Sequence, residues 1–273
     1  MFMDLRAYLH RIGYTGPLAL TSETLRALHR RHMLTVPFEN LDIGLGREIP
    51  LDPERSAEKI TAQRRGGFCY ELNGAFSALL TALGFRVTLL SARVASPQGI
   101  LSQEFDHLTL RVDLPEPWLA DVGFGDSFLE PLRLASGLEQ PDTAGIFRLI
   151  DTGERWRVER RQPDLSWLLE YDFSLLPRQL SDFAAMCHHN QTSPQSHFTQ
   201  NRICTLPTPQ GRVTLSNTRL IITAGGKKEE HALATDAEWH AALREHFGIV
   251  LKAGDRSQET GDRSQNEPHP PET

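Results

Sequence analysis

The segment Arg64-Arg65-Gly66-Gly67-Phe68-Cys69-Tyr70-Glu71-Leu72-Asn73 marks the start of the clearest helix in the chain. Two glycines let the backbone turn sharply there and let a ligand approach it closely. After them, apolar residues recur at steps of three and one, which is the stripe of an amphipathic helix, and Gly84 fits the position just past its end. The stripe consists of Leu72, Ala75, Phe76, Leu79, Leu80 and Leu83.

Cys69 falls in the first turn of this predicted helix. Unpaired N–H groups and the positive end of the helix dipole lie there, and both favour a thiolate over a thiol. The same N–H groups can hold a developing oxyanion, and Arg64 and Arg65 add positive charge. The pattern indicates a nucleophile. A buried structural cysteine is the alternative, because Cys is among the most buried residue types.

Together with the residues before it, this segment and its helix predict a mostly helical region over 1–84. Thr21 to Thr24 form a capping pattern ahead of a helix. Asp52 fits the N-cap of a further helix, with Pro53 at its first position. The stretch 36–41 is interpreted as a loop.

From residue 85 the periodicity changes, and residues 85 to about 185 predict a β region. Pro115-Glu116-Pro117 joins two of its strands as a turn, so these two form a hairpin. The predicted strands are 85–94, 108–114, 118–122, 147–150, 156–160 and 167–173.

The remainder predicts two strands, 213–215 and 219–223, and a helix over 236–247. Lys227-Lys228 is interpreted as a solvated turn between strands. The tail 252–273 has no apolar stripe and becomes proline-rich, which predicts a disordered segment without a catalytic role.

His107 and Asp121 are the candidates for a base and for the residue that orients it. A cysteine that carries an acyl group needs a base, and the base needs an acceptor that fixes its tautomer. His107 precedes a strand whose apolar side alternates from Leu108, and Asp121 ends the next strand, where a lone buried charge is costly. Because these strands form a predicted hairpin, we expect the two side chains to approach each other. A solvated strand end and a strand cap are the alternatives.

The composition is that of an ordinary soluble globular protein. The 273 residues carry a net charge of −6, which argues against a general nucleic-acid binder but leaves room for a small anionic cofactor. Three widely spaced cysteines make a poor disulfide framework and fit a reducing compartment. Residues 1–13 show no apolar signal region, and no run is long enough to span a membrane. We therefore expect a cytoplasmic protein that binds neither nucleic acid nor membrane.

No metal site is expected. Cys187-His188-His189 with His197 fits no zinc pattern, and adjacent histidines rarely point the same way. The sequence carries no signal for the oligomeric state.

The order Cys69, His107, Asp121 and the residues around them closely resemble the arylamine N-acetyltransferase family. Several separate segments match in order, which makes the resemblance specific. They are Tyr8 to Tyr14, Val36-Pro37-Phe38-Glu39-Asn40-Leu41, Arg64 to Asn73, Phe105-Asp106-His107-Leu108, Ala120-Asp121-Val122-Gly123-Phe124-Gly125 and Ser193-Pro194-Gln195-Ser196-His197-Phe198.

The resemblance implies an α+β fold with a papain-like Cys-His-Asp triad. The implied parts are a helical bundle over 1–84 with the cysteine, a β-barrel over 85–190 with the histidine and aspartate, and an α/β lid over 191–251, followed by the tail 252–273. It implies ping-pong chemistry with acetyl-CoA as co-substrate. Acetyl passes through Cys69 to arylamines, arylhydrazines or arylhydroxylamines, including drugs and other foreign amines.

The resemblance also implies roles for further residues. Phe38 and Phe124 would line an aromatic acceptor pocket that Asp106 borders. Apart from the resemblance, we interpret Glu39 and Arg64 as a partly buried ion pair that supports the Cys69 loop, with two unconnected surface charges as the alternative. The loop 96–104 lacks the Thr-Gly pair by which some eukaryotic members hold CoA, so the CoA contacts stay unassigned.

Two other functions remain open from the sequence. The Cys-His-Asp order also occurs in cysteine peptidases and transglutaminase-like enzymes, so a hydrolase is one alternative. A binding or regulatory module that retains the triad without activity is the other.

Overall fold

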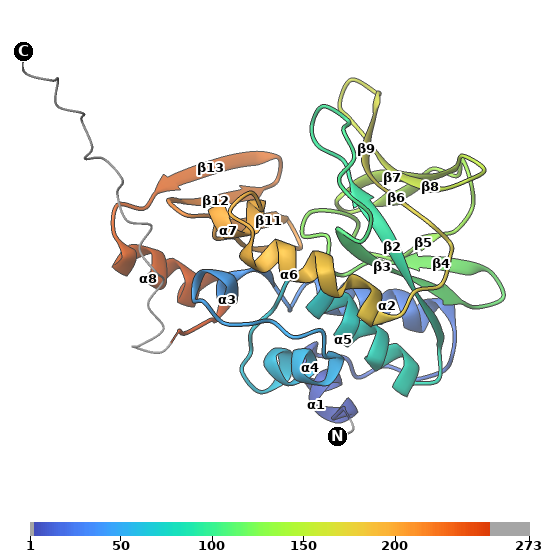
Figure 1. The fold of residues 1–273 in the computed structure, drawn as a ribbon, viewed down its shortest axis with the longest axis horizontal. Helices are drawn as coiled ribbons and strands as arrows, with labels where there is room; N and C mark the ends of the chain where they lie inside the picture. The colour runs from blue at the N-terminus through green and yellow to red at the C-terminus, as the bar shows by residue number, and fades with distance from the viewer. Residues whose placement is uncertain (1–2, 252–273) are drawn as a thin grey trace, which may run out of the picture.

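A computed structural model describes residues 3–251, which form helices and two antiparallel sheets. The N-terminal helices lie at the base of the molecule, and the two sheets rise on either side above them (Figure 1). The α+β class is confirmed. The division into three domains at the predicted boundaries stays a prediction, and the predicted disordered tail, 252–273, lies outside the described residues.

The N-terminal helices begin where their capping residues are. The Thr21 side chain accepts from the N–H of Thr24, and Asp52 accepts from the first N–H groups of the helix that Pro53 opens. Both predicted caps are therefore confirmed. The helices are α1 (Leu5–Arg11), α2 (Ser22–Met33), α3 (Leu41–Gly44), α4 (Pro53–Thr61) and α5 (Cys69–Ala82).

The long helix α5 lies in the main core. Gly84 has a φ of +99° and follows the C-cap Leu83, as the sequence predicted. Phe76 and Leu79 of α5 share one apolar cluster with Leu108 and Leu110 of the neighbouring sheet. This packing places the start of α5 beside the start of the strand that carries His107.

The β region is an eight-stranded sheet that is nearly closed like a barrel. Its order is β5-β4-β3-β2-β9-β8-β7-β6. The Gln140 side chain links the two edges, because its amide bonds the backbone N–H and C=O of Arg133 at 2.7 and 3.0 Å. The strands are β2 (Arg86–Val94), β3 (His107–Asp113), β4 (Pro117–Ala120), β5 (Leu132–Arg133), β6 (Gln140–Asp142), β7 (Gly145–Asp151), β8 (Trp156–Arg161) and β9 (Trp167–Phe173).

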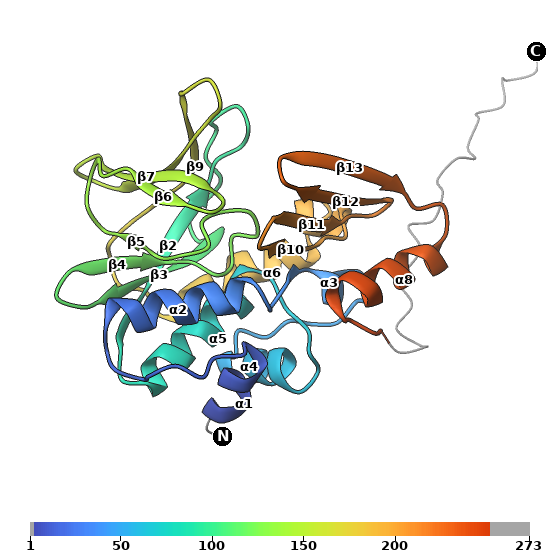
Figure 2. The same ribbon diagram turned by 180° about the vertical axis from the view of Figure 1, so that it is seen from behind.

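The C-terminal part combines short helices, a second sheet and α8, which lies beside α3 (Figure 2). This sheet has the order β1-β10-β11-β12-β13. No helix within residues 3–251 is long and apolar enough to cross a membrane. The elements are η1 (Leu180–Phe183), α6 (Ala184–Thr192), α7 (His197–Gln200), β10 (Cys204–Thr208), β11 (Gly211–Leu215), β12 (Arg219–Ala224), β13 (Lys227–Ala232) and α8 (Asp236–Phe247).

Two local predictions were wrong. The predicted loop 36–41 contains the strand β1 (Phe38–Glu39), which pairs with the distant strand β10. Lys227-Lys228 begins β13, and the turn lies at Gly225-Gly226, where both φ angles are positive. A two-residue strand such as β1 is too short to show an alternation of apolar and polar residues. The edge strand β13 is exposed on both faces and shows no such alternation either, so hydrophobic periodicity does not detect these strands.

Candidate active site

The loop before Cys69 needs glycine because it packs against residues 36–41. A Cβ at Gly66 would lie 1.8 Å from the carbonyl oxygen of Pro37, and the N–H of Glu39 donates to the carbonyl of Gly67 at 2.9 Å. Phe68 is the N-cap, and its N–H donates to the Glu71 carboxylate at 3.1 Å. Cys69 is therefore the first residue of α5, which confirms the prediction that it lies in the first turn.

The Cys69 thiol is buried, with 3% of the residue exposed. Burial raises the pKa of this thiol well above its ordinary range, and the Asp106 carboxylate adds to the rise, while the N–H of Leu108 acts in the opposite direction. The sulfur lies 3.9 Å from the carbonyl oxygen of Asp106. The raised pKa favours the thiol over the thiolate that the helix start predicted. Formation of the thiolate therefore needs a proton acceptor beside the sulfur.

His107 stands in sequence between Asp106 and Leu108, the two residues that influence the Cys69 sulfur. It is the first residue of β3, and 2% of it is exposed. In the β3–β4 hairpin, Leu110 faces Ala120, which brings the start of β3 beside the end of β4. The Nε2 atom of His107 lies 2.6 Å from Oδ2 of Asp121. The predicted approach of the two side chains is confirmed.

Hydrogen bonds surround the carboxylate of Asp121, which is fully buried. Asn73 Nδ2 and the N–H of Gly123 donate to Oδ1 at 2.9 and 3.0 Å, and the Tyr171 hydroxyl donates to Oδ2 at 2.9 Å. Burial alone would raise the pKa of Asp121, but His107, the Asn73 amide and the N–H of Gly123 hold it below the ordinary value. The residue therefore carries a negative charge next to His107.

The aspartate loop also packs directly on the cysteine. A Cβ at Gly123 would lie 2.8 Å from the Cα of Cys69 and 2.7 Å from Nδ2 of Asn73. Only glycine allows this contact. The backbones around Cys69 and Asp121 and the ring of His107 thus form one continuous buried unit.

The predicted ion pair involves a different arginine. Arg65, not Arg64, bonds the Glu39 carboxylate through Nε and Nη2 at 2.8 and 3.0 Å. Arg64 is exposed and has a φ of +53°. This left-handed conformation turns the backbone between the two arginines, and the sequence does not display such a turn at a non-glycine residue.

Lys59 enlarges this pair into a buried ion cluster. Its Nζ lies 2.6 Å from Asp42, 2.7 Å from Glu71 and 3.7 Å from Glu39. Arg65 also reaches Asp42, at 3.2 Å. We call the set Glu39, Asp42, Lys59, Arg65 and Glu71 the ion cluster.

The remaining candidates lie close to this unit. The Phe124 ring packs against His107 and Tyr171 at centroid distances of 5.4 and 5.1 Å. A Cβ at Gly125 would touch the Phe38 ring at 3.4 Å. The Asp106 carboxylate accepts a bond from Asn190 at 3.1 Å.

Sequence reasoning missed several residues that hold the site. Asn73 stands four positions after Cys69 and so shares its helix face, a signal that was available. Tyr171 and Lys59 carried no local signal, because each reaches the site from another element of the fold, Tyr171 from β9 and Lys59 from α4. Their contacts depend on how β9 and α4 pack.

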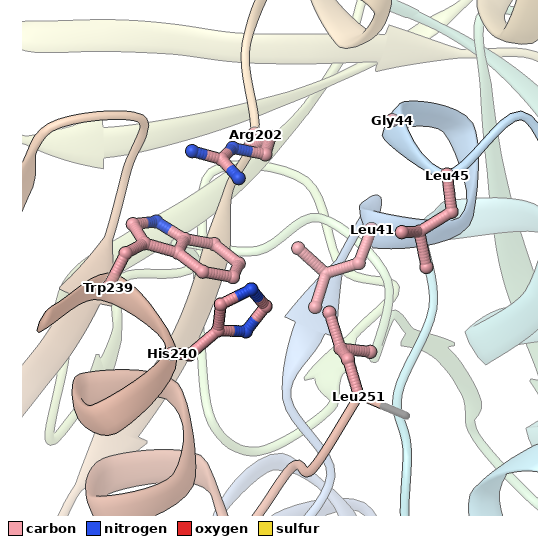
Figure 3. A pocket seen from close by; sticks show the side chains of 7 residues that line it. All are labelled: Leu41, Gly44, Leu45, Arg202, Trp239, His240 and Leu251. Carbon is pink, nitrogen blue, oxygen red and sulfur yellow. The ribbon is translucent and has the colours of Figure 1, made fainter. Parts of the chain in front are cut away.

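A separate pocket lies between α3 and α8 (Figure 3). The guanidinium of Arg202 lies 4.3 Å from the centre of the Trp239 ring beside it. No candidate site residue lines this pocket, and residues 3–251 contain no cluster of His, Cys, Asp or Glu suited to a metal. The pocket is lined by Leu41, Gly44, Leu45, Arg202, Trp239, His240 and Leu251.

Known proteins resemble the chain over most of its length. The family model described as N-acetyltransferase matches residues 21–256. An arylamine N-acetyltransferase of Escherichia coli (strain K12) is 38% identical over 249 residues, covering 90% of this chain and 88% of that protein. An arylamine N-acetyltransferase / N-hydroxyarylamine O-acetyltransferase of Salmonella typhimurium is 36% identical over 250 residues, with coverage of 90% and 88%. The structure of the Mycobacterium marinum arylamine N-acetyltransferase in complex with CoA matches with a TM-score of 0.85 and 34% identity, covering 92% and 96% of the two chains.

Proposed function

The chain belongs to the arylamine N-acetyltransferase family of acyltransferases, and on that premise we propose that it transfers acetyl from acetyl-CoA through Cys69 in two half-reactions. The observation that carries this proposal is the short bond between His107 and Asp121. The sulfur of Cys69 interacts with Asp106 and Leu108, the residues on either side of His107 in the sequence. A base, its orienting carboxylate and a thiol are thereby within one buried unit.

In the first half-reaction His107 takes the thiol proton. Its Nε2 faces Asp121, so Nδ1 is the nitrogen available to Cys69. The sulfur attacks the thioester carbonyl, and N–H groups at the start of α5 stabilise the oxyanion. The carbon–sulfur bond to CoA then breaks, and the leaving sulfur takes the proton from His107. Acetyl-Cys69 and free CoA result.

In the second half-reaction a neutral amine attacks acetyl-Cys69. His107 accepts the proton that the nitrogen loses, and it returns this proton to the sulfur as the thioester breaks. Asp121 stabilises the imidazolium in both halves without taking its proton. An arylamine suits this scheme because it is neutral and nucleophilic near pH 7. Arylhydrazines and arylhydroxylamines share these properties.

Aromatic side chains beside the base support an aromatic acceptor. Phe124 packs on His107, and Phe38 lies against the same loop at Gly125. Apolar rings of this kind bind a flat aromatic substrate, while Asp106 borders the site. The CoA complex of the Mycobacterium marinum protein supports acetyl-CoA as the co-substrate. The residues that contact CoA stay unassigned.

Intact mass after mixing with acetyl-CoA tests the central step. Wild type should gain one acetyl group, and Cys69→Ala should gain none. Cys187→Ala and Cys204→Ala are matched controls, since these cysteines are also buried, and both should be acetylated like wild type. An unmodified wild type, or an equal adduct on Cys69→Ala, would refute the proposal.

The fate of the acetyl group separates a transferase from a hydrolase. Acetyl-Cys69 should persist without amine and should disappear when an arylamine is added, with formation of the N-acetyl product. Rapid loss to acetate without amine would instead indicate a hydrolase.

A further inference from the structure

A single buried histidine, His29 of α2, bonds both ends of the loop that begins at Asp121. Its Nε2 accepts from the backbone N–H of Asp121 at 3.1 Å. Its Nδ1 bonds the carbonyl oxygen of Leu129 at 2.8 Å. One imidazole thus closes the loop from Asp121 to Leu129 and ties it to a helix of the N-terminal part.

These two bonds require one neutral tautomer of His29. A carbonyl oxygen only accepts, so Nδ1 carries the proton toward Leu129. A backbone N–H only donates, so Nε2 must be the acceptor for Asp121. A protonated ring would set N–H against N–H at this second contact. The geometry fits the imidazole and excludes the imidazolium.

The surroundings of His29 favour the same form. The ring is fully buried, stacks on Phe128 at 5.9 Å and meets Phe76 edge-on at 5.9 Å. Burial lowers the pKa of His29, while its bond to Leu129 and the negative charges of Asp121 and Asp142 act in the opposite direction. His32 lies on the same helix and interacts electrostatically with His29. Burial lowers the pKa of His32 as well.

The loop that His29 closes carries three parts of the site. Asp121 holds His107, Gly123 rests on the Cα of Cys69, and Phe124 covers the His107 ring. β4 ends at Ala120, so the N–H of Asp121 lies just beyond the sheet ladder and needs another acceptor when buried. His29 supplies that acceptor.

We propose that His29 is a positioning residue for acetyl transfer, which sets the backbone of Asp121 and, through it, the orientation of His107 toward Cys69. It touches neither substrate nor the reacting atoms. The inference rests on the roles proposed for Cys69, His107 and Asp121. It adds a connection from α2 to the triad.

Substitution of His29 separates positioning from mere packing. His29→Leu keeps the bulk and removes both bonds. We expect the rate of Cys69 acetylation by acetyl-CoA to fall about ten- to a hundredfold, because small misplacements of a catalytic group have effects of this size. Alkylation of Cys69 by iodoacetamide, followed by peptide mass at several pH values, should also slow and change its pH profile.

Two amide variants isolate the bond to Asp121. In His29→Gln the side-chain oxygen reaches the position of Nε2 and can accept from Asp121, so most of the rate should return. In His29→Asn the amide reaches only the position of Nδ1, so the bond to Leu129 returns without the other. We expect His29→Asn to be slower than His29→Gln, and this comparison holds even if His29→Leu does not fold.

His32→Leu is the matched control. His32 lies on the same helix, is fully buried, packs on Phe76 at 5.4 Å and bonds the Tyr8 hydroxyl at 3.1 Å, away from Asp121. Its loss should lower the melting temperature and leave the acetylation rate and the alkylation profile of wild type. Equal losses in the His29 and His32 variants, or equal rates for His29→Gln and His29→Asn, would overturn the inference. If wild type itself gains no acetyl group, the proposed function fails, and the alkylation profiles still decide the role of His29.

Discussion

Two buried polar regions flank Cys69, and they are built differently. The ion cluster, on one side, combines three carboxylates with Lys59 and Arg65. On the other side the single carboxylate of Asp121 is held by Asn73, Tyr171, Gly123 and His107. The first region joins many charges, and the second surrounds one charge with oriented donors.

The difference follows from what each region holds. Opposite charges in the ion cluster fix the backbone before Cys69, because Glu39 also accepts from the N–H of Gly66 at 3.3 Å and Glu71 caps α5. Near Asp121 a second strong charge would compete with His107 for the carboxylate. Neutral donors keep Asp121 ionised and leave its interaction with His107 intact. The helix α5 connects the regions, since it contributes Glu71 to one and Asn73 to the other.

The largest effect should come from neutralising the single charge. In Asp121→Asn the amide cannot stabilise the imidazolium of His107 and favours the wrong tautomer. We expect the acetylation rate to fall about 10³- to 10⁴-fold, as in related triads. Single-turnover acetylation with acetyl-CoA measures it. Asp126→Asn removes an exposed carboxylate of the same loop and should stay near wild type. A comparable loss in both variants would show that the loop, rather than the charge, matters.

Removal of one cation from the ion cluster should affect stability next. Arg65→Met leaves Glu39 with Lys59 at 3.7 Å, and Asp42 with Lys59 and the more exposed Arg47. Breaking a buried pair costs about 3–5 kcal/mol. Arg64→Met is the control, because an exposed arginine contributes about 0.5 kcal/mol or less. Urea unfolding gives both values. Similar midpoints for the two variants would contradict the assignment of Arg65 as the buried partner.

The smallest expected effect is a change of pH dependence within the ion cluster. Burial raises the pKa of Glu71 to about 7, although Lys59 opposes the rise. The folded protein therefore holds this proton more tightly than the unfolded chain. Its favourable contribution is complete below the unfolded pKa, 4.5, and is lost as the pH rises through about 7.

Glu71→Gln removes this titration. Between these pH values the free energy of unfolding of wild type should fall relative to the variant, by at most about 1.4 kcal/mol per pH unit. Urea titrations at a series of pH values measure the difference. Parallel curves for the two proteins would show that Glu71 does not titrate in this range.

Much of the local structure was predictable because it depends on neighbours in sequence. The caps at Thr21 and Asp52, the helix start at Cys69 and the helix over 236–247 all follow from capping residues and apolar period. Short-range hydrogen bonds decide these features, and their residues are adjacent in the chain. The hairpin that brings His107 to Asp121 belongs to the same class, since a short turn joins its strands.

Contacts between remote segments were decided by the tertiary structure. The pairing of β1 with β10, the reach of Tyr171 to Asp121 and the bonds of His29 each join residues far apart in sequence. The choice of Arg65 over Arg64 depended on which side of the backbone each faces. The sequence alone therefore determined that a thiol, a base and a carboxylate stand at the starts and ends of particular elements. Packing of those elements selected the groups that surround them, because a buried polar group takes whichever partner the fold brings within bonding distance.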